Sequence, residues 1–94
     1  PVSELPSVKP GPKTVQVDIQ NFAFSPREIR VPVDSAINWT NKDSATHTAT
    51  SDTGAFNSGL LSTGSSFKHT FNQKGIFNYF CSPHPSMTAT IIVE

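Results

Sequence analysis

Short runs in which apolar and polar residues alternate, separated by turn-forming residues, extend along most of this chain. Every second residue is apolar or aromatic over much of residues 14–20, 29–33, 36–41, 67–71, 77–81 and 88–93. A period of two places alternate side chains on opposite faces of a strand, and no run of any length has the helical period of 3.6. With a further strand-like stretch at 48–50, the pattern predicts an all-β fold, a Greek-key β-sandwich of about seven to eight strands.

Some local expectations follow from individual residues. Trp39 lies on the inward-facing side of its predicted strand and is expected to anchor the core. Residues 72–75, Asn-Gln-Lys-Gly, have the length and the glycine of a hairpin connection. Pro32 is compatible only with an edge or a bulge. Residues 51–66 are rich in Ser, Thr and Gly and are expected to be turns, with a short helical turn as the alternative.

The length of 94 residues predicts one domain with one hydrophobic core. Residues 1–13 hold four of the eight prolines, which indicates an N-terminal tail or linker ahead of a domain at 14–94. Seven basic and seven acidic residues cancel, so nucleic acid is not an expected partner. No apolar run reaches the ~20 residues of a transmembrane helix, and the start lacks the features of a signal peptide. We therefore expect a mature or trimmed chain, which its tail could tether to a membrane.

The single cysteine and the single methionine flank a histidine in the pattern Cys81-x2-His84-x2-Met87. At the residue frequencies of this chain, the product 3/94 × 1/94 gives this spacing a chance of roughly 0.0003. Thiolate, imidazole and thioether donors suit copper, and two histidines, one cysteine and a weak methionine form the blue-copper ligand set. His47, which stands where a strand begins after a polar loop, is the predicted second histidine.

The stretch 75–87, Gly-Ile-Phe-Asn-Tyr-Phe-Cys-Ser-Pro-His-Pro-Ser-Met, resembles the ligand loop of cupredoxins, the small type 1 blue copper proteins, most of all amicyanin and plastocyanin. The likeness extends over about residues 14–94. It implies that His47, Cys81 and His84 bind one copper ion strongly and that Met87 is the long axial ligand. It also implies a periplasmic or extracytoplasmic electron carrier. One departure is Thr48, where relatives usually have an asparagine that ties the two ligand loops together.

The same resemblance implies that electrons pass through His84. Pro83, Pro85 and Met87 could form an apolar rim around it, where redox protein partners would dock. We expect the protein to be a monomer. Pro83 has no N–H to donate to the sulfur of Cys81, which predicts a reduction potential below the high end of the class.

Other interpretations are weaker. Taken alone, each of the four residues is more simply explained by core packing, and His69, between Phe67 and Phe71, is assigned to packing. An enzyme is not expected, because a Cys-His nucleophilic pair would need an oxyanion hole and an orienting residue. The alternative function is a copper-binding or copper-delivery module of a larger or membrane-tethered assembly. A structural zinc site is third, because zinc seldom takes a methionine ligand.

Overall fold

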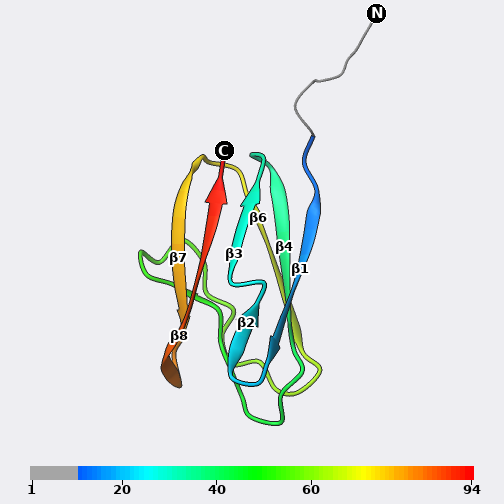
Figure 1. The fold of residues 1–94 in the computed structure, drawn as a ribbon, viewed down its shortest axis with the longest axis vertical. Helices are drawn as coiled ribbons and strands as arrows, with labels where there is room; N and C mark the ends of the chain where they lie inside the picture. Colours follow the sequence, from blue (N-terminus) through cyan, green and yellow to red (C-terminus); the bar gives the residue numbers. More distant parts are fainter. Residues whose placement is uncertain (1–10) are drawn as a thin grey trace, which may run out of the picture.

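The computed structural model describes residues 11–94, which form eight strands in two layers (Figure 1). The strands are β1 (Thr14–Gln20), β2 (Ala23–Ser25), β3 (Glu28–Val31), β4 (Ser35–Asn41), β5 (Thr50–Ser51), β6 (Ser66–Phe71), β7 (Gly75–Cys81) and β8 (His84–Val93). The predicted all-β sandwich of seven to eight strands is confirmed. Most of the predicted tail, residues 1–10, lies outside the described residues. Within residues 11–94 no helix is long and apolar enough to cross a membrane.

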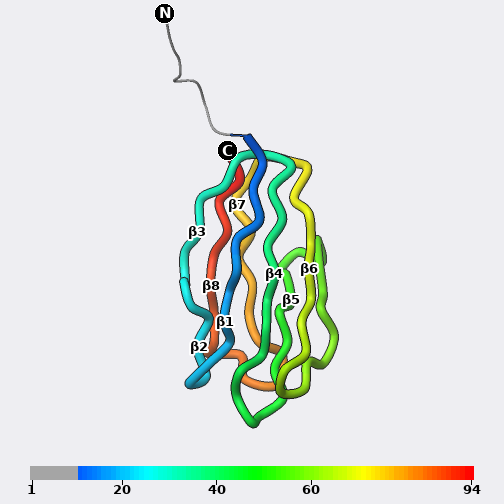
Figure 2. Tube along the Cα trace, turned by 90° about the vertical axis from the view of Figure 1, so that its right-hand side faces the viewer, coloured from blue at the N-terminus to red at the C-terminus, as the bar shows by residue number. Residues whose placement is uncertain are grey.

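Each sheet has four strands, and each mixes parallel with antiparallel pairs. One sheet has the order β2-β1-β4-β6, in which β1 runs parallel to β4, and the other has the order β3-β8-β7-β5, in which β3 runs parallel to β8. Figure 2 shows the two layers from the side. Because successive strands repeatedly cross from one layer to the other, residues far apart in sequence meet at the ends of the sandwich.

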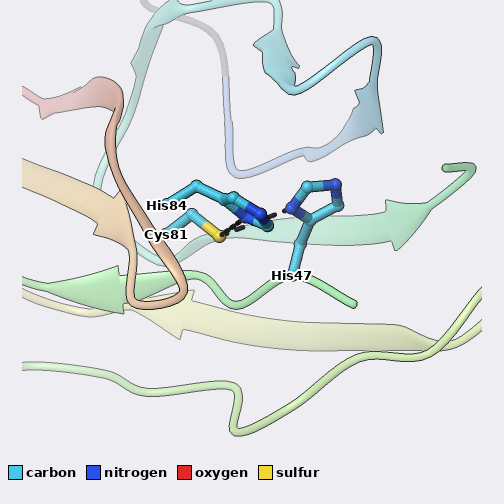
Figure 3. A group of neighbouring side chains, drawn as sticks. All are labelled: His47, Cys81 and His84. Carbon is cyan, nitrogen blue, oxygen red and sulfur yellow. Dashed lines mark hydrogen bonds between the residues drawn. The ribbon is translucent and has the colours of Figure 1, made fainter. Parts of the chain in front are cut away.

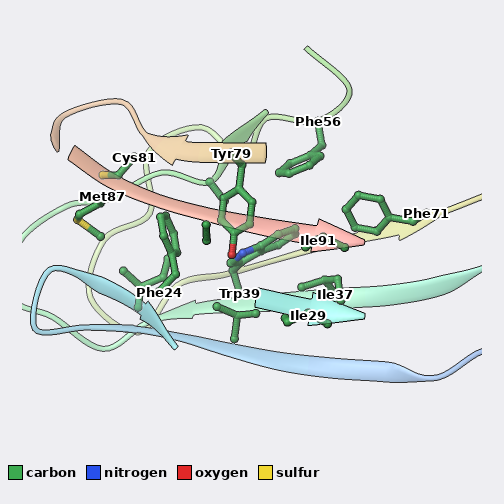
Figure 4. Close-up of a cluster of buried hydrophobic side chains, with 14 of the residues drawn as sticks. Phe24, Ile29, Ile37, Trp39, Phe56, Phe71, Tyr79, Cys81, Met87 and Ile91 are labelled. Carbon is green, nitrogen blue, oxygen red and sulfur yellow. The ribbon is translucent and has the colours of Figure 1, made fainter. Parts of the chain in front are cut away.

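The core lies between the sheets and follows the alternation in the sequence. Val17 and Ile19 of β1 are fully buried, as are Ile37 and Trp39 of β4. Trp39 stacks on Phe56 at a ring-centroid distance of 5.2 Å and meets Tyr79 edge-on at 5.5 Å, so its predicted role as core anchor is confirmed (Figure 4). Burying large aromatic side chains of this kind contributes about 1.5–3 kcal/mol each.

Several local predictions need correction. Residues 72–74 are not a hairpin turn, because β6 pairs with β4 whereas β7 pairs with β8 and β5, so this connection passes between the layers. The predicted strand 29–33 ends at Val31, before Pro32, which has no N–H to continue a ladder. The last strand begins at His84, four residues earlier than predicted. Residues 51–66 contain no helical turn.

Candidate metal centre

Three predicted ligands converge at one end of the sandwich. The Sγ atom of Cys81 lies 3.4 Å from Nδ1 of His47 and 3.5 Å from Nδ1 of His84, and the three donor atoms all lie within 4.8 Å of one another (Figure 3). His47 and Cys81 are fully buried, whereas His84 is half-buried. The structure therefore gives one thiol and two imidazoles a common focus, with only His84 reaching toward solvent.

Strand pairing fixes these three side chains. Cys81 ends β7 and His84 begins β8, and the two residues are paired across a two-residue turn, Ser82-Pro83. A register shift between Phe80 and Cys81 marks an irregularity where β7 enters this turn. His47 is held by two backbone hydrogen bonds with Leu61, of 3.2 and 2.8 Å. The donors therefore come from paired backbone rather than from free loops, which limits their movement.

The donor spacing fits a single first-row metal ion. Two donors bound at about 2.0–2.3 Å, with about 110° between their bonds, lie about 3.5 Å apart. The observed S···N distances of 3.4 and 3.5 Å agree with this separation. A buried thiol with two imidazoles is a soft donor set of the kind that copper prefers.

Met87 belongs to the same end of the core. Its side chain is 6% exposed and lies in the buried cluster that also contains Cys81, and Figure 4 draws both residues at that end. The prediction that Met87 contributes to an exposed rim is therefore wrong. As an inward-facing residue of β8, Met87 presents its thioether to the interior, while Pro83 and Pro85 are exposed.

Comparison with protein families matches residues 12–94 to the copper binding proteins of the plastocyanin/azurin family. The chain belongs to this family. It is therefore a cupredoxin, and it is similar to amicyanins, as the sequence predicted. The family and the buried donor set together give copper as its cofactor, in a site that fits type 1 copper.

Individual relatives agree with this assignment. The chain is 28% identical over 96 residues to amicyanin-alpha of Methylorubrum extorquens. The match covers 96% of this chain and 81% of that protein. It is 32% identical to the structure of a purple cupredoxin from Nitrosopumilus maritimus, with a TM-score of 0.78, covering 85% of this chain and 99% of the other. It is also 27% identical to part of a copper-containing nitrite reductase from Thermus scotoductus, with a TM-score of 0.80, covering 93% of this chain but 23% of that chain.

Thr48 joins the segment that carries His47 to the turn that follows Cys81. Its hydroxyl accepts a hydrogen bond of 2.8 Å from the backbone N–H of Ser82 and lies 2.9 Å from the hydroxyl of Thr50. Its backbone N–H donates to Sγ of Cys81 at 3.5 Å. The side chain of Thr48 thus links the segment of His47 to the segment of Cys81.

Asp43 is a part of the site that its local sequence does not reveal. Its Oδ2 atom lies 2.8 Å from Nε2 of His47. Because Nδ1 of His47 faces the sulfur and an ionised carboxylate can only accept, Nε2 carries the proton and donates a hydrogen bond to Asp43. Hydrogen bonds from the backbone N–H groups of Phe22 and Asn21, and from His47, hold the pKa of Asp43 below its usual value, while its partial desolvation acts in the opposite direction. Its place four residues before His47, the predicted ligand, was the only signal in the sequence.

His69 lies outside this group, as predicted. Its ring packs against Phe71 at a centroid distance of 4.7 Å and against Phe56 at 5.4 Å. Desolvation among these rings lowers the pKa of His69. It therefore contributes to core packing on β6.

Proposed function

We propose that this protein is a type 1 copper electron carrier, in which His47, Cys81 and His84 bind copper strongly and Met87 is the weak axial ligand. The observation that supports it best is the convergence of Nδ1 of His47, Sγ of Cys81 and Nδ1 of His84 within 4.8 Å, in a chain of a copper-binding family. When bound, copper supplies a one-electron Cu(II)/Cu(I) couple.

The residues of this chain contribute rigidity and exclusion of water. Cys81 and His47 are fully buried on hydrogen-bonded backbone, so their donor atoms have little freedom to move when the charge changes. The burial of Met87 places the soft thioether on the inner side, where water cannot replace it. A site that stays nearly the same in both oxidation states exchanges electrons with little rearrangement.

We propose that redox protein partners dock around His84. This ligand is half-buried, and Pro83 and Pro85 beside it are exposed, so they give the partner a small apolar contact surface. Replacing Pro85 with Glu should slow electron exchange with a partner, while Ile76→Glu, at another exposed apolar position, should leave it unchanged. An equal rate for the Pro85 variant and the parent protein would exclude this docking surface.

We also propose that the copper domain comprises residues 14–94, that residues 1–13 serve as a tail or linker, and that the protein works as an extracytoplasmic monomer without enzymatic activity of its own. The beginning of β1 at Thr14 and the family match from residue 12 support the boundary. A truncated chain beginning at Gly11 should bind copper with the affinity of the full chain. Its failure to do so would contradict this division.

Electron self-exchange separates a carrier from a delivery module. In a carrier, a mixture of oxidised and reduced copper-loaded protein exchanges electrons rapidly, which NMR line broadening detects, and voltammetry shows a reversible one-electron wave. A protein that binds Cu(I) tightly and passes it to a chelator, without a reversible wave, would contradict the carrier function.

The second candidate is a copper-binding or copper-delivery module of a larger assembly. The nitrite reductase supports it, because a fold like that of this chain accounts for only 23% of that chain. A longer native form of the protein, detected by its mass in the source cells, would favour this candidate.

A further inference from the structure

The turn between β1 and β2 has an unusual backbone for its sequence. Gln20 pairs with Ala23, which leaves a two-residue hairpin loop of Asn21 and Phe22, and both residues have φ of 56°. Such loops favour glycine at the second position, and a bulky residue there is strained. Phe22 therefore holds a position where glycine would be easier, and strained residues of this kind cluster at functional sites.

Asp43 holds this turn through both carboxylate oxygens. The backbone N–H of Asn21 donates to Oδ1 at 2.7 Å, and the backbone N–H of Phe22 donates to Oδ2 at 2.9 Å. The same Oδ2 accepts the hydrogen bond from Nε2 of His47 at 2.8 Å. One carboxylate thus joins His47 to a turn whose residues lie 22 and 21 positions before Asp43 in the chain.

The turn places the Phe22 ring against both imidazoles. Its centroid lies 5.1 Å from that of His47 and 4.9 Å from that of His84, and the ring is perpendicular to each, at 89° and 88°. The side chain remains 53% exposed. Phe22 therefore lies between solvent and one side of the two histidines.

Asp43 itself does not depend on the turn for its position. Its backbone N–H donates to Oδ1 of Asn41 at 2.8 Å, and its carbonyl accepts a hydrogen bond of 2.6 Å from the hydroxyl of Thr63. The carboxylate is thus presented by a loop that its own backbone contacts hold. Changing the side chain of residue 43 leaves those contacts in place.

We propose that Asp43 is a positioning residue that fastens the Asn21-Phe22 turn to His47, so that Phe22 is held as an aromatic cover over the two histidines of the copper site. This inference rests on the proposed function of that site. The carboxylate keeps the proton of His47 on Nε2 and Nδ1 free to bind copper, and it makes the imidazole a stronger donor. The Phe22 ring limits the access of water and small chelators to the metal.

The first test uses the metal-free protein and NMR hydrogen exchange. Asp43→Asn leaves one side-chain acceptor atom for three donors, so the amide protons of Asn21 and Phe22 should exchange about tenfold to a hundredfold faster, the range expected when a charge-assisted hydrogen bond is lost. Asp52→Asn makes the same change of charge at an exposed residue and should leave both rates unchanged. Unchanged exchange in Asp43→Asn would overturn the proposal.

The second test measures Cu(II) affinity and reduction potential. Loss of a carboxylate partner from a ligand histidine typically lowers metal affinity by about 10–100-fold. Asp43→Asn should show this loss and a higher potential, and Asp43→Glu should recover part of both. An affinity equal to that of Asp52→Asn would count against the positioning role. If the parent protein bound no copper, the proposed function would fail, while hydrogen exchange would still report on the contact of Asp43 with the turn.

Phe22→Gly tests whether the Phe22 ring covers the two histidines. The variant should fold, because glycine relieves the strain at φ of 56°. Its melting temperature should equal or exceed that of the parent protein, while transfer of copper to a chelator should become several times faster, an effect that the loss of a covering ring would produce. Leu60→Ala, at a residue 74% exposed, is the matched control. Copper transfer at the parent rate in Phe22→Gly would remove Phe22 from the proposal.

Discussion

At the scale of single residues, the contacts of the Cys81 sulfur should tune the reduction potential of the proposed copper site. Thr48 donates one backbone hydrogen bond to that sulfur, at 3.5 Å. Pro83, two residues after the cysteine, has no N–H and cannot supply a second. Hydrogen bonds to the sulfur withdraw electron density and favour Cu(I), so this site lacks one contribution that would raise its potential.

Replacing Pro83 with alanine should therefore raise the reduction potential. A net hydrogen bond of about 0.5–1.5 kcal/mol corresponds to about 20–60 mV for a one-electron couple. Voltammetry of the copper-loaded variant beside the parent measures this change. Pro85→Ala, which removes a proline from the same loop at another position, is the control. An unchanged or lower potential in Pro83→Ala would show that the missing donor is not what limits the potential.

At the scale of strands and turns, the sequence predicted what alternation determines. Val17 with Ile19, and Tyr79 with Cys81, face inward because a period of two leaves them no other face. The proposed ligands Cys81, His84 and Met87 could be singled out because rare residue types stand there at short spacing. The pairing of strands was not, since the 72–74 connection has hairpin-like residues and yet joins the two sheets.

The contacts that tie separate elements together were also beyond prediction. Asn21-Phe22 lacks the glycine that normally marks a two-residue turn, so only the pairing of Gln20 with Ala23 reveals it. In the sequence, Asp43 is one polar residue of a loop. Only the fold places the turn between β1 and β2, and His47, in contact with its carboxylate. Such contacts depend on tertiary arrangement, and no local pattern encodes them.

The central strand β7 carries a test of core packing. Within residues 11–94, the buried hydroxyl of Tyr79 and the buried indole N–H of Trp39 have no hydrogen-bond partner, and burial raises the pKa of Tyr79 to about 12. An unpaired buried polar group costs about 1–3 kcal/mol. Tyr79→Phe should therefore raise the free energy of unfolding by about 1 kcal/mol in urea denaturation. Destabilisation of the variant would show that the hydroxyl bonds to the indole of Trp39.

At the scale of the whole molecule, stability should depend on pH through His69. Desolvation lowers its pKa in the folded protein, so between that pKa and the ordinary value of 6.5 the unfolded chain binds more protons. Stability therefore falls as the pH drops through about 6.5, and the loss levels off below the folded pKa. Urea titrations of the parent protein and of His69→Gln at pH 7.5 and pH 5.5 measure this loss, which should be smaller in the variant. Because both proteins keep the other two histidines, the contributions of those histidines cancel in the comparison. An identical loss in both proteins would exclude His69 as the cause.

The proposed electron-carrier function requires that Cys81, held between His47 and His84, binds Cu(II) through its sulfur. The most direct measurement is the visible spectrum during titration of the metal-free protein with Cu(II), for the parent protein and for Cys81→Ser. We expect an intense thiolate-to-copper band that saturates at one equivalent, is bleached by ascorbate and returns on oxidation, and is absent from Cys81→Ser. A folded parent protein that stays colourless with one equivalent of Cu(II), or a Cys81→Ser variant with the same band, would contradict it.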